Sequence, residues 1–428
     1  MEAPLSQFQA IMYQKTQQTW STARVILQLA VCVRLEGPIE AETLRQAAVH
    51  LSARYPILCS RLDVNEGDLI QRQDGGTISL EVIDIPDDEE QASKLLSAEA
   101  DRPLDLFQSN PFRIILGVVR PGTAFLMLVA HHIFVDEFAL QRVLAEYLKH
   151  VFDPEGIKGA SAAIEKDHAF LTWRLQQEKM SRDGTYARKA EYWLKYLAGA
   201  DPTIHLPGRP ADPPLQKLAS IPFELDPSKT ERSFNHARKL GITHNALLVS
   251  AIFHTLREVT GQGDITLALT SSARRPPFGQ TIGQFAESSL VRQRSRGNKP
   301  DSRVTQLLFR DIVSGIKNYI PHSYFVEQLD WLKLRWDKKF TMSDVHVNYL
   351  PREAELDGIA ARAGYRVSRF ELVDRAAPAQ PSYYGVVLGF SLRPRDNILR
   401  GALLYESAII DAQLAREITT SLRDELAR

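Results

Sequence analysis

Residues 124–137 read AFLMLVAHHIFVDE, an apolar run followed by two histidines and, at positions 136 and 137, an aspartate and a glutamate. The apolar run does not alternate with polar residues, so it predicts a strand that is buried on both faces. Beyond Glu137, apolar residues recur at helical spacing from Leu140 to Val151 and predict an amphipathic helix. The histidines and the acids are therefore expected where a buried strand passes through a loop into a helix.

The two histidines of this junction are not expected to share one role. Adjacent residues of a strand point to opposite faces, so one imidazole can face an opening while the other packs inward. A neutral imidazole can take a proton from an attacking amine or hydroxyl. Asp136, four residues after His132, can accept a hydrogen bond or pair with an arginine and so hold the loop. These residues taken alone fit a catalytic site and equally a buried histidine pair with satisfied hydrogen bonds.

Outward from this junction, strand and helix patterns follow one another without a regular repeat. Strands are expected at 24–35, 112–119, 124–130, 264–270, 344–350, 386–392 and 401–405. Helices are expected at 41–53, in a segment that ends near 192–194, from the N-cap Thr243 to Gly261, and from 412 onward. Pro121-Gly122 suits a tight turn between two of the strands. The pattern predicts an α+β protein with an N-terminal lobe at 1–160, a C-terminal lobe at 161–428 and a linker at 153–161.

Composition excludes several classes of protein. The 428 residues are 44% hydrophobic and 24% charged, as in an ordinary globular chain, and 52 basic residues balance 52 acidic ones. We therefore expect no nucleic-acid partner and no attraction to an anionic membrane. The two cysteines, Cys32 and Cys59, have no metal-ligand spacing, and neither a signal peptide nor a membrane-spanning run is evident. The sequence predicts a soluble, cytoplasmic protein.

Several segments, in the same order along the chain, resemble the condensation domains of nonribosomal peptide synthetases, which are relatives of chloramphenicol acetyltransferase. HHIFVDE resembles their HHxxxDG motif, and Ser6-Gln7-Phe8-Gln9 with Met12 and Tyr13 is similar to their opening SxAQxxMW pattern. Residues 35–62 resemble the helix that leads into RHxxLRTRF, and 191–200 resemble the start of the second lobe. Residues 260–294 are similar to the strand, arginine and IGxFxNTLxLR run, and 403–413 resemble the closing LxYxxxxFD segment.

The resemblance implies a fold and a reaction. It implies two chloramphenicol-acetyltransferase-like lobes arranged in a V, with a tunnel between them that admits phosphopantetheine arms. It implies an acyltransferase that moves an acyl group from a carrier-protein phosphopantetheine thioester to an amine or hydroxyl in natural-product biosynthesis. His132 takes the place of the catalytic histidine and His131 that of the structural one, while Asp136 takes the place of an aspartate that pairs with an arginine, here Arg274. The enzyme would bind no cofactor or metal of its own.

Among the residues that depart from the family pattern, three are candidates for contact with the substrate. Glu137 replaces a glycine, Glu287 an asparagine and Ser288 a threonine. Glu137 can interact with the dipole of the helix that begins there, or it can bind a cationic or hydroxylated acceptor. Glu287 can be a solvated side chain or, with Ser288, can contact the substrate.

Alternatives remain open at this point. A coenzyme A-dependent O-acyltransferase of the same superfamily would keep the same motif. A catalytically silent module that recruits a partner enzyme is the other alternative, although such relatives usually lose the second histidine and this chain keeps His132. We expect a free-standing monomer that meets an acyl or peptidyl carrier protein. The sequence leaves the acyl group and the acceptor undefined.

Overall fold

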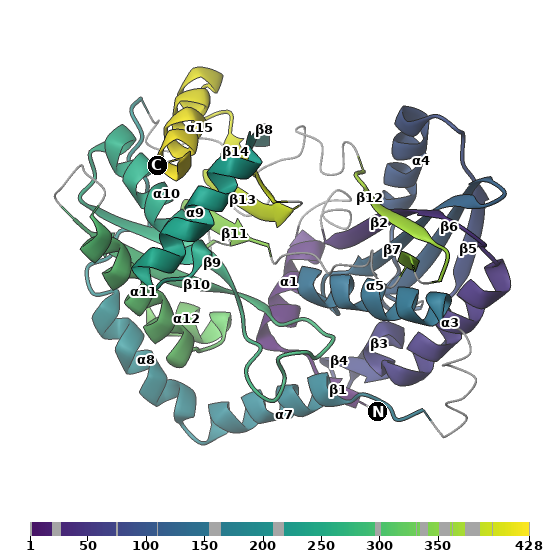
Figure 1. Cartoon of the computed structure of the whole chain (residues 1–428). Helices are drawn as coiled ribbons and strands as arrows, with labels where there is room; N and C mark the ends of the chain where they lie inside the picture. The colour runs from purple at the N-terminus through teal and green to yellow at the C-terminus, as the bar shows by residue number, and fades with distance from the viewer. Residues whose placement is uncertain are drawn as a thin grey trace. The chain divides into compact units, whose positions relative to one another are not determined.

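The computed structural model describes residues 2–18, 27–73, 76–108, 110–153, 164–208, 218–295, 301–330, 332–333, 341–350, 360–361, 363–372, 386–395 and 397–427. The chain forms two compact units, and each is built from more than one segment. The first unit comprises residues 1–179, 274–285 and 353–377. The second unit comprises residues 180–273, 286–352 and 378–428. Both units mix helices and sheets, as the sequence predicts (Figure 1).

The main sheet of the first unit has five strands in the order β12-β2-β7-β6-β5. Its strands are β2 (Gln28–Glu36), β5 (Leu80–Asp84), β6 (Phe112–Arg120), β7 (Thr123–His131) and β12 (Arg366–Phe370). The central strand β7 runs antiparallel to β2 and β6, and all nine of its residues are buried. The strand predicted from the apolar run is thus confirmed. Gly122 has a φ of 79°, which the turn between β6 and β7 requires and a glycine readily adopts.

Helices and a smaller sheet complete the first unit. The helices are α1 (Gln7–Gln18), α3 (Ala41–Arg54), α4 (Glu89–Asp101), α5 (Glu137–Phe152) and most of α7 (Ala169–Arg182), together with the 3₁₀ helix η1 (Pro56–Cys59). The smaller sheet has the order β1-β4-β3, with β1 at Glu2–Pro4, β3 at Ser60–Asn65 and β4 at Asp68–Gln73. One face of α5 is buried, from Ala139 to Phe152, as its apolar stripe predicts.

A single boundary at residue 160 does not describe these units. Strand β12, from residues 366–370, pairs antiparallel with β2 and forms one edge of the first unit's sheet. Residues 274–285 also belong to the first unit, although they lie between β9 and β10 in the sequence. The expected linker at 153–161 falls, except for Asp153, outside the described residues.

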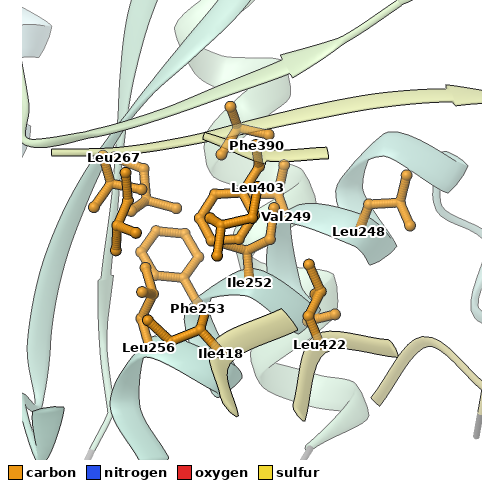
Figure 2. Close-up of a cluster of buried hydrophobic side chains, with 14 of the residues drawn as sticks. Leu248, Val249, Ile252, Phe253, Leu256, Leu267, Phe390, Leu403, Ile418 and Leu422 are labelled. Atoms are coloured by element: carbon orange, nitrogen blue, oxygen red, sulfur yellow. The ribbon is translucent and has the colours of Figure 1, made fainter. Parts of the chain in front are cut away.

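The second unit is built on a six-stranded sheet with the order β10-β9-β11-β13-β14-β8. Its strands are β8 (Leu218–Leu225), β9 (Asp264–Ser272), β10 (Ala286–Arg294), β11 (Val345–Tyr349), β13 (Leu388–Arg395) and β14 (Ile398–Glu406). Its helices are α8 (Thr185–Tyr196), α9 (Pro227–Leu240), α10 (His244–Thr260), α11 (Ser302–Lys317), α12 (His322–Gln328) and α15 (Ala412–Ala427). Side chains of α10 and α15 pack with those of the sheet in one hydrophobic core (Figure 2).

The ends of α10 confirm the capping predicted from the sequence. Thr243 accepts a hydrogen bond from the backbone N–H of Ala246, and Gly261 ends the helix with a φ of 70°. No helix among the described residues is both long enough and apolar enough to cross a membrane. Cys32 and Cys59 are both buried.

Candidate active site

A tight turn joins β7 to α5 and carries both histidines of the motif. The N–H groups of Phe134 and Val135 donate to the carbonyl of His131, at 3.0 and 3.4 Å. His131 is buried, and its Nδ1 accepts a hydrogen bond from the N–H of Ile133 at 3.2 Å. Burial, with a smaller contribution from the neighbouring His132, lowers the pKa of His131 to about 3. His131 is therefore a neutral acceptor inside the turn, where it stabilises the backbone.

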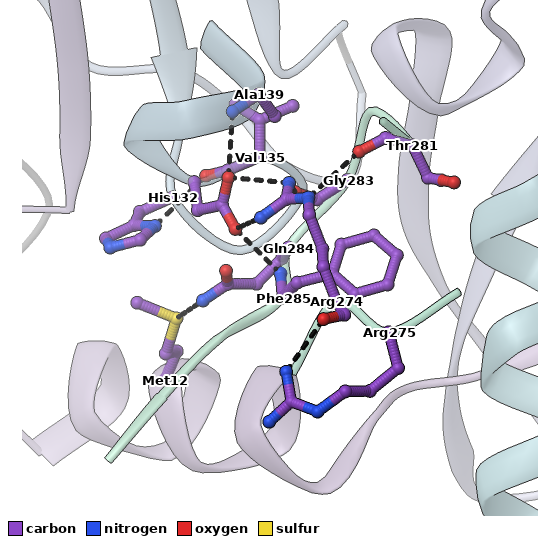
Figure 3. A network of polar contacts seen from close by, with 11 residues as sticks. Met12, His132, Val135, Ala139, Arg274, Arg275, Thr281, Gly283, Gln284 and Phe285 are labelled. Carbon is purple, nitrogen blue, oxygen red and sulfur yellow. Dashed lines mark hydrogen bonds and ion pairs between the residues drawn. The ribbon is translucent and has the colours of Figure 1, made fainter. Parts of the chain in front are cut away.

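His132 is held in one orientation by the backbone. Its Nδ1 lies 3.0 Å from the carbonyl oxygen of Val135 (Figure 3). The backbone N–H of His132 donates to the carbonyl of Leu27 at 2.6 Å. A carbonyl oxygen can only accept, so Nδ1 of the neutral imidazole carries the proton and Nε2 keeps a lone pair. His132 is only partly buried. This tautomer and orientation are those of a general base that acts through Nε2.

Asp136 connects the turn, the following helix and the 274–285 segment. It is the N-cap of α5, because its Oδ1 accepts from the N–H of Ala139 at 2.9 Å. Its Oδ2 accepts from the N–H of Phe285 at 3.0 Å. Arg274 donates to both carboxylate oxygens, through Nη2 to Oδ1 at 2.8 Å and through Nη1 to Oδ2 at 2.5 Å. The ion pair implied by the resemblance is thus present, in the bidentate form.

Arg274 is enclosed on all sides within the first unit. Its Nε donates to the carbonyl of Thr281 and its Nη2 to that of Gly283, each at 3.1 Å (Figure 3). The guanidinium carbon lies 4.6 Å from the ring centre of Phe138 and 4.4 Å from that of Phe285. Only 5% of each side chain of the ion pair is exposed. Removing one partner would leave the other charge buried, at a cost of about 3–5 kcal/mol.

Gly283 lets the 274–285 segment approach this cluster. Its carbonyl accepts from the N–H of Asp136 at 3.3 Å. A Cβ at this position would lie 2.2 Å from the ring of Phe170, so no larger residue fits without a shift of the ring or the backbone. Close packing against Phe170 therefore explains why a glycine occupies this position of the IGxF pattern, and the sequence alone did not reveal that contact.

Gln9 also contacts the histidine turn, and sequence reasoning assigned it no role. Its Nε2 donates to the carbonyl of Ile133 at 2.8 Å, and the residue is fully buried. The pattern around Ser6 and Gln9 was the only signal that could have indicated this contact.

Glu137 occupies the first turn of α5. Its Oε1 accepts from Nε2 of Gln141, one helical turn further on, at 3.0 Å. Gln141 in turn accepts a hydrogen bond from Arg369 of β12. The carboxylate thus lies where it interacts favourably with the helix dipole, as one of the two interpretations of Glu137 requires. Its role toward an acceptor stays a prediction.

Glu287 and Ser288 lie on β10 in the second unit. The interpretation of Glu287 as a solvated side chain is wrong, because only 3% of the residue is exposed. Its two oxygens accept from the hydroxyl of Tyr319 at 3.1 Å and from the N–H of His322 at 3.3 Å. Burial raises the pKa of Glu287 to about 8. Ser288 is partly buried, and as the next residue of the strand it points to the opposite face.

Comparison with known proteins relates this geometry to a family. The chain is 26% identical to one of the plipastatin synthase subunits of Bacillus subtilis (strain 168) over 356 residues, which is 79% of this chain but 13% of that protein. The SgcC5 protein of Streptomyces globisporus has a TM-score of 0.77 at 20% identity, with 99% of this chain and 98% of that chain covered. The epimerization domain from the third module of tyrocidine synthetase B has a TM-score of 0.79 at 18% identity, with 100% and 95% covered.

The structural likenesses confirm the mixed helix-and-sheet, chloramphenicol-acetyltransferase-like fold of two lobes, and the V arrangement of those lobes stays a prediction. The family model called Condensation domain matches residues 1–334 and so includes the histidine turn, Arg274 and both carboxylates that depart from the usual motif. Since that match extends over more than half of the 428 residues, the chain belongs to the condensation domain family.

Proposed function

We propose that this chain transfers an acyl group from the phosphopantetheine thioester of a carrier protein to an amine or hydroxyl acceptor. The observation that carries the proposal is the imidazole of His132. Its Nδ1 is bound to the carbonyl of Val135, so its Nε2 can accept a proton. The family membership supplies the class of reaction, and the geometry of the turn supplies the residue.

In the proposed reaction, the acceptor N–H or O–H donates a hydrogen bond to Nε2 of His132. The acceptor atom attacks the thioester carbonyl while its proton passes to Nε2. The tetrahedral adduct then expels the thiolate as the carbon–sulfur bond breaks, and His132 returns the proton to the sulfur. The products are an amide or ester and the free thiol of the carrier arm, and His132 ends as the neutral imidazole with which it began.

Three buried groups would support this chemistry without reacting. His131 is neutral and accepts from the turn, so it can hold His132 without competing for the acceptor proton. Asp136 and Arg274 neutralise each other and join the start of α5 to the 274–285 segment. We assign all three a structural role at the site.

Substrate contacts are proposed for three residues that depart from the family pattern. Glu137 would favour an acceptor with a cationic or hydrogen-bond-donating group, and Glu287 and Ser288 would contact polar atoms of the substrate. For Glu137 we favour the helix-dipole role, because its carboxylate lies in the first turn of α5.

A hydroxyl acceptor belongs in any test of the proposal. SgcC5 was crystallised with a naphthyl-substituted 1,2-ethanediol, a molecule that carries hydroxyl groups and no amine. Ester formation is therefore the second candidate for this chain.

We further propose that the chain acts as a free-standing monomer in the cytoplasm with a carrier protein as its partner. The chain has only two cysteines, both of them buried, and this low content fits a reducing compartment. The match covers only 13% of the plipastatin synthase subunit, which carries much more sequence than this chain. Whether the chain acts without further domains is therefore tested by assaying it alone.

The test is acyl transfer from a carrier protein loaded with acetyl, octanoyl or alanyl groups to a panel of primary amines and 1,2-diols, followed by mass spectrometry. His132→Ala is expected to lower turnover by at least about 10²-fold and to unfold like wild type, because a partly exposed imidazole contributes little packing. His205→Ala is the matched control, since that histidine is exposed on the second unit. Near-normal turnover by folded His132→Ala would overturn the role proposed for His132, whereas absence of turnover by the wild type with every donor and acceptor would favour the recruiting-module alternative.

A further inference from the structure

A chain of buried side-chain hydrogen bonds ends on the histidine turn. Gln9 of α1 donates from Nε2 to the carbonyl of Ile133 at 2.8 Å and to Oε1 of Gln71 at 3.1 Å. Gln71 donates in turn to the hydroxyl of Ser60 at 3.4 Å, and that hydroxyl donates to the carbonyl of Pro56 at 3.0 Å. Gln9 and Ser60 are fully buried, and Gln71 is 3% exposed.

We propose that Gln9 is a positioning residue for His132, an inference that rests on the proposed function. Every polar atom of the Gln9 side chain is used, because Oε1 accepts from the N–H of Ser6 at 2.8 Å. The N–H of Gln9 donates back to the hydroxyl of Ser6 at 3.1 Å. This reciprocal capping pair fixes the start of α1, and with it the direction of the Gln9 amide.

The carbonyl that Gln9 holds lies inside the turn that orients the imidazole. Ile133 follows His132 directly, and the carbonyl of Val135, two residues later, accepts from Nδ1 of His132. The N–H of Ile133 donates to His131, so both polar groups of Ile133 are fixed by buried side chains. A shift of this peptide would therefore move the imidazole relative to the carbonyl that selects its tautomer.

Loss of Gln9 should affect the chemical step more than binding. A displacement of a catalytic group by about 1 Å can cost about 10²-fold in rate, while interactions that bind the substrate elsewhere are unchanged. A purely structural glutamine would lower stability and the fraction of active enzyme without changing the kinetic constants of the folded molecules.

The experiment compares Gln9→Leu with Tyr147→Phe in the acyl-transfer assay described above. Tyr147 is also buried in the first unit, and its hydroxyl donates to the carbonyl of Leu44 at 2.8 Å. Both variants thus remove a buried donor from a backbone carbonyl, and only Gln9→Leu removes it from the histidine turn. We expect Gln9→Leu to lower kcat about tenfold or more with little change in KM for donor or acceptor. Tyr147→Phe should have wild-type kinetic constants.

A second readout follows the imidazole itself. In protein labelled with ¹⁵N-histidine, the ring signals of His132, assigned by their loss in His132→Ala, report which nitrogen carries the proton. We expect Nδ1–H in the wild type and in Tyr147→Phe, and a mixture of tautomers in Gln9→Leu. Wild-type kcat and an unchanged tautomer in folded Gln9→Leu would overturn the inference. If His132→Ala itself remains active, the proposed role of His132 as general base fails, and the tautomer measurement still decides whether Gln9 orients the ring.

Discussion

Loss of either partner of the Asp136–Arg274 pair should destabilise the first unit by several kcal/mol. The two side chains are 5% exposed and joined by two hydrogen bonds, so Arg274→Ala leaves a carboxylate buried without its counter-charge. We expect a cost of about 3–5 kcal/mol. In a unit of about 200 residues this corresponds to a fall in Tm of about 6–20 °C.

Asp136→Ala should cost more than Arg274→Ala, because Asp136 also caps α5 and accepts from Phe285. The variant Asp88→Ala measures how much a helix cap alone contributes to the free energy of unfolding. Asp88 caps α4 in the same unit through a hydrogen bond from the N–H of Gln91, and that bond is exposed. A cap of this kind is worth about 0.5–2 kcal/mol. The excess of Asp136→Ala over Asp88→Ala therefore measures the buried interactions of the carboxylate.

The assay is urea unfolding, followed by tryptophan fluorescence, of the two single variants, the double variant and Asp88→Ala. Each single change removes the same ion pair, so the double variant should lose much less than the sum of the two, by about 0.5–3 kcal/mol. The reasoning is refuted if both single variants unfold like Asp88→Ala and their effects add.

Three further predictions concern substrates and pH. If Glu137 only interacts with the helix dipole, Glu137→Gln should lower the free energy of unfolding by about 1 kcal/mol or less and leave the acceptor KM unchanged in steady-state assays. A rise confined to the acceptor KM would show instead that Glu137 binds the acceptor. Burial raises the pKa of Glu287 from 4.5 to about 8. Between pH 4.5 and pH 8 the folded protein therefore keeps a proton that the unfolded chain has lost, so the free energy of unfolding should fall as pH rises through this range. Glu287→Gln should weaken that fall in Tm measured from pH 5 to pH 8, and an identical pH profile would contradict the assignment. With matched acyl groups, kcat/KM should be about tenfold or more higher for the carrier-bound donor than for the coenzyme A thioester, because the surface of the carrier adds contacts and electrostatic attraction. Equal use of both donors would favour the coenzyme A-dependent reaction.

Local patterns in the sequence were enough to predict the strand, turn and helix around the histidines. The apolar run of β7 and the stripe of α5 depend on residues close in sequence, and so does the cap at Thr243. The partner of Asp136 was different, because Arg274 lies 138 residues away and only the family resemblance connected the two.

Contacts between distant segments were not predictable from those patterns. Gln9 and Ile133 are 124 residues apart, and no periodicity indicates that an amide of α1 reaches the carbonyl of the turn. A solvated side chain was one of the two interpretations of Glu287 that the sequence left open. Its burial depends on Tyr319 and His322, which come from a later part of the chain.

The pairing of β12 with β2 has a consequence for the synthesis of the protein. Strand β2 (Gln28–Glu36, QLAVCVRLE) lies next to the edge of its sheet, and the strand that covers it comes from residues 366–370. As the chain leaves the ribosome, the outer N–H and C=O groups of β2 therefore stay open until residue 370 has emerged. Open strands with apolar side chains pair readily with other chains. Truncated forms that end before β12 should consequently aggregate, and a chaperone that shields β2 would act during most of translation.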